Sequence, residues 1–186
     1  MEAIDIGKAG SLNLPRLGQL GFVVDSIEDS LPYYASFYGL DTWFKPKYVQ
    51  KQYQAGGKHL DLDLDLTFAY SGNTQIELIA TRAQEENLYH RHLAEYGGGL
   101  HHLGFYVNNL DERTRVMREL GIGVLVEGEF KTAGGGLARF AYLDTKQVFG
   151  IILEVIEIRL YGINVPQNSL MMNVAAITGD VLKTKR

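Results

Sequence analysis

An internal repeat constrains the fold of this chain more than any other feature. Residues 19–24 read QLGFVV and residues 102–107 read HLGFYV, so both segments share Leu, Gly, Phe and a final Val. Each is followed by a polar helix start, in which an N-cap residue precedes an acid by three positions: Ser26 before Asp29, and Asn109 before Glu112. Each predicted helix then ends at a glycine, the residue that best tolerates the left-handed C-cap. This shared order indicates a duplicated unit.

The repeat continues beyond the predicted helices. The triplet Phe-Ala-Tyr occurs at residues 68–70 and again at 140–142. Residues 75–79 and 152–156 are β-prone runs that each place a glutamate near the centre, Glu77 and Glu154. Each half therefore reads as a strand, a helix and then two or three strands.

The positions of the repeated segments predict the domain boundaries. We expect an N-terminal arm over 1–15, a first module over 16–80, a linker over 81–99, a second module over 100–157 and a C-terminal extension over 158–186. The polar segment 45–59 interrupts the first module, and we interpret it as a solvated loop. The extension is interpreted as a packing arm with a helix in the apolar stretch 169–182. Pro32 predicts that the first helix begins near Ser30, or that a short turn precedes it, because proline is tolerated only in the first helical turn.

Composition excludes several classes of function. The 186 residues include 18 Lys and Arg against 22 Asp and Glu, a net charge of −4 that supplies no basic field for nucleic acid or an anionic membrane surface. The absence of cysteine excludes disulfides, zinc–thiolate sites and cysteine nucleophiles. No segment approaches the ~20 apolar residues of a membrane span. Because charged residues interrupt the first twenty positions, we expect no signal peptide and a cytoplasmic location.

Four polar residues stand at matching positions in the strands of the repeat: Gln19, Glu77, His102 and Glu154. Alternate residues of a strand share a face, and in each of these strands the opposite face is apolar and assigned to the core beneath a helix. A single glutamate of this kind is explained by a solvated sheet face. The recurrence in all four strands favours a concave site between the two halves, because buried glutamates are almost always paired or metal-bound.

The residue types predict the chemistry of that site. One imidazole, two carboxylates and one amide oxygen suit a single divalent ion such as Zn, Ni, Co, Mn or Mg, with positions left for water and substrate. Non-haem iron oxygenases usually present two histidines and one carboxylate. Gln19 stands where the second histidine would be, which disfavours dioxygen chemistry.

Residues 16–157 resemble the vicinal-oxygen-chelate superfamily, which includes glyoxalases, bleomycin-resistance proteins and dioxygenases. The segments GNTQIELI over 72–79, GGLHHL over 98–103 and GIILE over 150–154 are similar to methylmalonyl-CoA epimerases, although that family would place a histidine at position 19. The order Gln, Glu, His, Glu resembles the zinc ligands of certain lactoylglutathione lyases. The resemblance implies an α+β fold in which two tandem βαβββ modules form a curled mixed sheet around a central cleft.

The resemblance also implies a reaction. We expect metal-dependent proton transfer next to a carbonyl, by an isomerase, epimerase or lyase acting on a small thioester or 2-oxo substrate. Glu154 is favoured as the base, with Glu77 as a ligand or partner base. Tyr70, Tyr106 and Tyr142 are candidates to line the pocket. His101 is assigned no role, because neighbouring strand residues face opposite ways.

Two alternatives stay open: a metal-free binding protein of the bleomycin-resistance type and, less favoured, an extradiol-type dioxygenase. The expected partners are a small-molecule substrate and a second copy of the chain in a homodimer, with neither nucleic acid nor a membrane.

Overall fold

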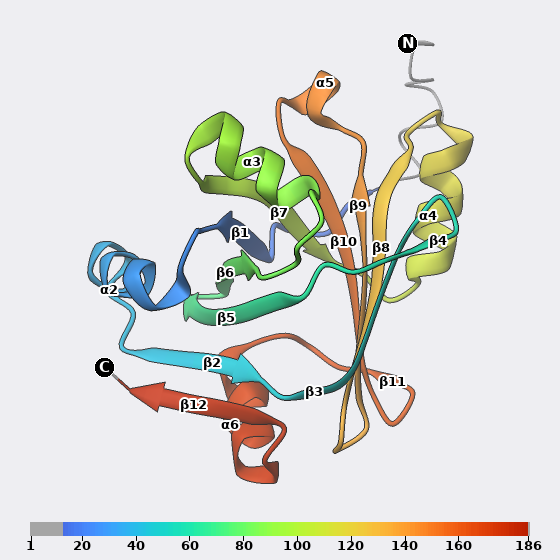
Figure 1. Cartoon of the computed structure of the whole chain (residues 1–186). Coiled ribbons are helices and arrows are strands. Elements are labelled where there is room, and N and C mark those ends of the chain that lie inside the picture. Colours follow the sequence, from blue (N-terminus) through green and yellow to red (C-terminus); the bar gives the residue numbers. More distant parts are fainter. Residues whose placement is uncertain (1–12, 186) are drawn as a thin grey trace.

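A computed structural model describes residues 13–185 of the chain (Figure 1). Most of the arm expected over 1–15 therefore lies outside the described residues. The strands are β1 (Gln19–Val23), β2 (Thr42–Pro46), β3 (Tyr48–Ala55), β4 (Lys58–Leu60), β5 (Leu64–Ser71), β6 (Thr74–Thr81), β7 (Gly99–Tyr106), β8 (Val124–Thr132), β9 (Gly136–Leu143), β10 (Ile152–Leu160), β11 (Ile163–Asn164) and β12 (Val181–Lys185). The helices are α2 (Ile27–Tyr38), α3 (Leu88–Tyr96), α4 (Leu110–Glu119), α5 (Lys146–Phe149) and α6 (Ser169–Thr178). No helix within 13–185 is long and apolar enough to cross a membrane.

All twelve strands join one mixed sheet in the order β12-β2-β5-β6-β1-β7-β10-β9-β8-β3-β4, with β11 attached to β10. The centre of the sheet joins the two repeats. β1 pairs in parallel with β6, β7 pairs in parallel with β10, and β1 and β7 meet antiparallel. The sheet curls, and α2 and α4 lie on its outer side (Figure 1). The α+β fold expected from the resemblance is confirmed.

The alternation of apolar residues determines which sheet face each helix covers. Leu20, Phe22 and Val24 pack in one cluster with residues of α2. Leu103 and Phe105 pack in the corresponding cluster with residues of α4. The inner face forms a third core, which contains residues from both repeats. The four polar positions singled out in the sequence therefore belong to strands whose outer faces are already filled.

The start of the first helix differs from the expectation. α2 begins at Ile27, where the Ser26 side chain accepts a hydrogen bond from the Asp29 backbone N–H, and continues through Pro32. An interior proline costs ~3 kcal/mol. Packing of the helix against the sheet outweighs this cost, and it includes an edge-on contact between Tyr34 and Phe22 with ring centroids 4.9 Å apart. The end of the helix agrees with the prediction, because Gly39 adopts φ 63°.

The segment 45–59 is not a solvated loop, and that prediction is wrong. Its residues form the end of β2, β3 and the start of β4, and β3 crosses to pair antiparallel with β8 of the second repeat. Aromatic packing accounts for the pairing, because the rings of Tyr48 and Tyr53 lie 4.5 Å and 5.5 Å from that of Phe130. Between these two tyrosines, Val49, Lys51 and Gln52 are exposed and Gln50 is half-buried.

The C-terminal extension packs as expected. The predicted helix is α6, and the following strand β12 pairs antiparallel with β2. Figure 1 shows α6 and β12 beside β2, on the side of the molecule where the curled sheet opens.

Candidate functional site

The fold brings together the four polar residues predicted from the repeat. The Nε2 atom of His102 lies 2.9 Å from a carboxylate oxygen of Glu154, 3.3 Å from the amide oxygen of Gln19 and 3.7 Å from a carboxylate oxygen of Glu77. These residues lie on the adjacent strands β7, β10, β1 and β6. The His102 side chain is fully buried, and that of Glu77 is the most accessible of the three ionisable groups, at 13% exposed.

The repeated glycines make this convergence possible. Gly21 pairs with His102 across the β1–β7 ladder, and a Cβ atom at Gly21 would lie 1.9 Å from the imidazole ring. Gly104 pairs with Gln19 in the same ladder, and a Cβ there would lie 2.5 Å from the Gln19 amide oxygen. Each polar side chain thus lies over the glycine of the other repeat. This reciprocal arrangement explains why Leu-Gly-Phe follows both Gln19 and His102.

A hydrogen-bond network orients the amide of Gln19. Its Nε2 donates to Gln75 Oε1 over 2.7 Å, so its oxygen is the atom directed at the imidazole. Gln75 also accepts from the Tyr106 hydroxyl at 3.0 Å and donates to the Tyr70 hydroxyl at 2.8 Å. Tyr70 in turn donates to Gln167 of the C-terminal extension. Gln75 was not among the site residues predicted from the sequence, although it lies two residues before Glu77 and therefore on the same strand face.

The site concentrates negative charge in a buried place. Burial and, secondarily, the charge of Glu154 raise the pKa of Glu77 well above the ordinary carboxyl value. The Oε2 atom of Glu154 is buried and has no hydrogen-bond partner, because its approach to His102 is close but not aligned as a hydrogen bond. Two carboxylates, an imidazole and an amide oxygen are donors that suit a divalent cation, which would offset this charge.

In the structure of residues 13–185, the four side chains are not arranged around a common point as the ligands of a bound metal ion would be. Within 13–185, no three His, Cys, Asp or Glu side chains are arranged to hold a metal ion. The carboxylates of Glu77 and Glu154 approach the imidazole nitrogen directly. The fit to a cation therefore rests on the donor set and on the unpartnered oxygen of Glu154.

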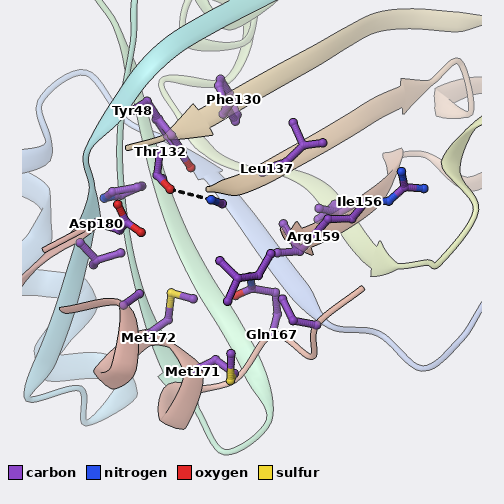
Figure 2. Close-up of a pocket in the computed structure, with 18 of the residues that line it drawn as sticks. Tyr48, Phe130, Thr132, Leu137, Ile156, Arg159, Gln167, Met171, Met172 and Asp180 are labelled. Carbon is purple, nitrogen blue, oxygen red and sulfur yellow. Dashed lines mark hydrogen bonds between the residues drawn. The ribbon is translucent and has the colours of Figure 1, made fainter. Parts of the chain in front are cut away.

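A cavity of about 250 Å³ opens from these residues, and Gln19, Glu77 and Glu154 form part of its wall. Most of the remaining wall is apolar. In Figure 2, Met171 and Met172 of α6 lie across the cavity from Tyr48 of β3 and Phe130 of β8. Neither Tyr48 nor the two methionines were predicted to line a cavity, because the segment 45–59 was expected to be a solvated loop and α6 a packing helix.

The three tyrosines predicted to line the pocket occupy different places. Tyr106 lines the cavity. Tyr70 and Tyr142 are not among the lining residues; Tyr70 belongs to the hydrogen-bond network behind Gln19. Tyr142 is 2% exposed and packs behind the site, with its ring 5.0 Å from that of His102 and its hydroxyl 3.2 Å from that of Tyr89. Its place in the core follows from the apolar inner cluster around it.

Comparisons with known proteins agree with this architecture. The family model described as the Glyoxalase/Bleomycin resistance protein/Dioxygenase superfamily matches residues 18–142. The uncharacterized protein YqjC of Bacillus subtilis is 24% identical over 142 residues, which cover 76% of this chain and 91% of that protein.

Solved structures in the same superfamily share the fold at low identity. Methylmalonyl-CoA epimerase from Mycobacterium tuberculosis has a TM-score of 0.56 at 17% identity, covering 92% of this chain and 95% of its own. A hypothetical protein from Bacillus halodurans has a TM-score of 0.53 at 24% identity, covering 76% and 92%. A methylmalonyl-CoA epimerase variant from Streptomyces coelicolor, solved with 2-nitronate-propionyl-CoA, has a TM-score of 0.54 at 17% identity, covering 77% and 97%. The solved structures show the shared fold, and the family model over residues 18–142 shows that the chain belongs to the Glyoxalase/Bleomycin resistance protein/Dioxygenase superfamily.

Proposed function

We propose that this protein is a metal-dependent enzyme that moves a proton at the carbon next to a carbonyl group of a small thioester or 2-oxo compound. One observation carries the proposal: an amide oxygen and two carboxylates converge on a buried imidazole nitrogen at the wall of an apolar cavity. Gln19, Glu77, His102 and Glu154 would hold one divalent ion. Such an ion supplies Lewis acidity, which favours the negative charge that develops on a carbonyl oxygen when an α-proton leaves.

Glu154 is the proposed base. A carboxylate has two oxygen atoms, so Glu154 could offer its buried, unpartnered Oε2 to the ion and accept a proton from a bound substrate at its other oxygen; the residue forms part of the cavity wall. A positioned general base typically contributes 10²–10⁴-fold. Glu77 occupies the matching strand position of the other repeat and is proposed as a ligand or as the partner base that returns the proton.

The apolar wall supports the same chemistry. The wall on the side of the sheet includes Tyr48, Phe130 and Ile156. The methionines of α6 lie across the cavity from Tyr48 and Phe130. Excluding water would strengthen the attraction between a cation held at this site and the negative charge that develops on the substrate, and it would protect a reactive carbanion from the solvent. Flexible Met side chains adapt to the shape of an acyl or alkyl group, and Arg139 and Arg159 also line the cavity.

Metal analysis and turnover test the proposal together. We expect protein purified without chelators to hold close to one divalent ion per chain, and Glu77→Ala and His102→Ala to lose it. Metal-loaded protein is then assayed with methylmalonyl-CoA, the thioester acted on by the named structural relatives, and with a hemithioacetal, by following α-proton exchange in deuterated water. Glu154→Gln should abolish exchange and leave the fold intact. Glu119→Gln on the exposed side of α4 is the matched control.

Two results would contradict the proposal. Active, metal-replete Glu154→Gln protein would remove Glu154 as the base. A protein that takes up no metal under any loading condition would favour the metal-free binding alternative. The expected homodimer stays a prediction, which analytical ultracentrifugation would check.

A further inference from the structure

Two consecutive histidines contact each other beside the candidate metal site. The Nδ1 atoms of His101 and His102 lie 3.1 Å apart, and the two residues are 2% and 0% exposed. Neighbouring residues of a regular strand point to opposite faces, so the sequence analysis expected no such contact. The contact needs a local cause in the backbone.

An irregularity in the ladder between β1 and β7 supplies that cause. Gly21 pairs with His102 and the next residue, Phe22, pairs with Leu100, so His101 is an extra residue on β7. A bulge of this kind bends the strand and re-aims the side chains around it. The ring of His101 is thereby brought against the imidazole that faces the carboxylates.

The proton positions on these two rings are linked. Two imidazole nitrogens at 3.1 Å form a hydrogen bond only if one carries a proton and the other accepts it. To bind a cation through Nε2, neutral His102 must keep its lone pair there and carry its proton on Nδ1. His101 must then present an unprotonated Nδ1, with its own proton on Nε2.

We infer that His101 is a positioning residue, which accepts a hydrogen bond from Nδ1–H of His102 and so fixes the tautomer and the ring orientation in which Nε2 can hold the metal ion. The inference rests on the proposed function, because it assigns a role only if this site binds a cation. Metal-binding histidines almost always donate their second ring N–H to a nearby acceptor. Within residues 13–185, His101 is the one hydrogen-bond partner of the Nδ1 atom of His102.

The surroundings hold His101 in this position. Its ring centroid lies 5.0 Å from that of His92, 5.3 Å from that of Tyr89 and 5.4 Å from that of Tyr142. His92 and Tyr89 belong to α3 and Tyr142 to β9, and the ring of Tyr142 also packs against His102 at 5.0 Å. Rotation of His101 away from its partner would therefore require several packed aromatic groups to move.

Two substitutions at His101 separate hydrogen bonding from packing. His101→Phe keeps a planar ring and removes the acceptor, and His101→Asn keeps an acceptor near the position of Nδ1. Dissociation constants for Zn²⁺ are measured by competition with a chromophoric chelator, and Co²⁺ binding is followed by its d–d absorption. We expect His101→Phe to weaken both ions by about 10–100-fold and His101→Asn to recover most of that loss. His59→Phe, a change of the same kind at an exposed histidine of β4, is the control and should bind as the wild type does.

Nuclear magnetic resonance of the wild-type protein provides a readout independent of any variant. In the Zn²⁺-loaded protein, a long-range ¹H–¹⁵N spectrum should show His102 protonated at Nδ1 and His101 protonated at Nε2. The same spectrum decides the question if His101→Phe does not fold.

Each outcome has one meaning. Wild-type affinity and an unchanged Co²⁺ spectrum in His101→Phe, or an unprotonated His102 Nδ1 in the loaded wild type, would overturn this inference and leave the proposed function standing. A wild-type protein that binds neither ion would overturn both. Loss in His101→Phe with recovery in His101→Asn supports the inference.

Discussion

Substitution of Gly21 by alanine tests whether the site depends on a missing side chain. The added Cβ would lie 1.9 Å from Cε1, 2.1 Å from Nε2 and 2.5 Å from Nδ1 of His102. Non-bonded carbon atoms need about 3.5 Å, so the imidazole must retreat by roughly 1.5 Å. Gly21 is not among the residues with left-handed backbone, so alanine adds a steric conflict without backbone strain.

The size of the effect follows from that displacement. A functional group tolerates a shift of only about 0.5 Å, and a misplacement near 1 Å can cost about 100-fold in rate. We therefore expect Gly21→Ala to lower both Zn²⁺ affinity and α-proton exchange by on the order of 100-fold. Overpacking should also lower the free energy of unfolding by about 1–3 kcal/mol, measured by urea denaturation.

Gly123→Ala is the matched control for this prediction. Its Cβ would meet the Cβ of Asp144 at 3.6 Å, an ordinary contact, and Gly123 also lacks left-handed backbone. We expect wild-type affinity and stability from it. If Gly21→Ala binds Zn²⁺ as tightly as Gly123→Ala does, then the imidazole does not need the space above Gly21, and the geometric reasoning fails.

Three further predictions concern the network, the cation and a surface ion pair. Gln75→Leu leaves the buried N–H of Gln19 without its acceptor, so it should cost ~1–3 kcal/mol of folding stability and weaken Zn²⁺ binding; an unchanged urea midpoint would argue against the network. Chelator treatment should lower the melting temperature, because a ligand at 100 times its dissociation constant stabilises the folded state by ~2.7 kcal/mol, and His102→Ala should show no such response in calorimetry. A hydrogen bond from Arg139 lowers the pKa of Asp111, so the carboxylate stabilises the fold above its ordinary pKa near 3.8 and loses this contribution as the pH falls through its lowered value. Asp111→Asn should therefore be less stable than wild type at pH 7, and the difference in the free energy of unfolding should disappear once the pH has fallen below the lowered pKa of Asp111.

The internal repeat and the alternation of apolar residues along strands were enough to predict the four central strands of the sheet. The repeat located β1, β6, β7 and β10, and strand alternation placed Gln19, Glu77, His102 and Glu154 on their inner face. Such local rules work where each strand has one helix-covered face.

Features that depend on long-range contacts were not predictable in this way. The pairing of β3 with β8 joins segments far apart in the chain, and nothing in the polar segment 45–59 specified that partner. The bulge at His101 shifts the register within a single ladder, which alternation cannot reveal. Packing energy likewise overrode the local preference of Pro32.

The crossing of β3 has a consequence for how the chain reaches its native state. A strand encoded in the first repeat completes the ladder of the second, and closing that distance requires ordering much of the intervening chain. Neither repeat contains all the strands that its own strands pair with. Two polypeptide fragments separated between the repeats would therefore have to associate to complete the sheet. Because the two repeats are interlaced through this ladder, we expect the described sheet to unfold in one cooperative transition, even though the duplication is still visible in the sequence.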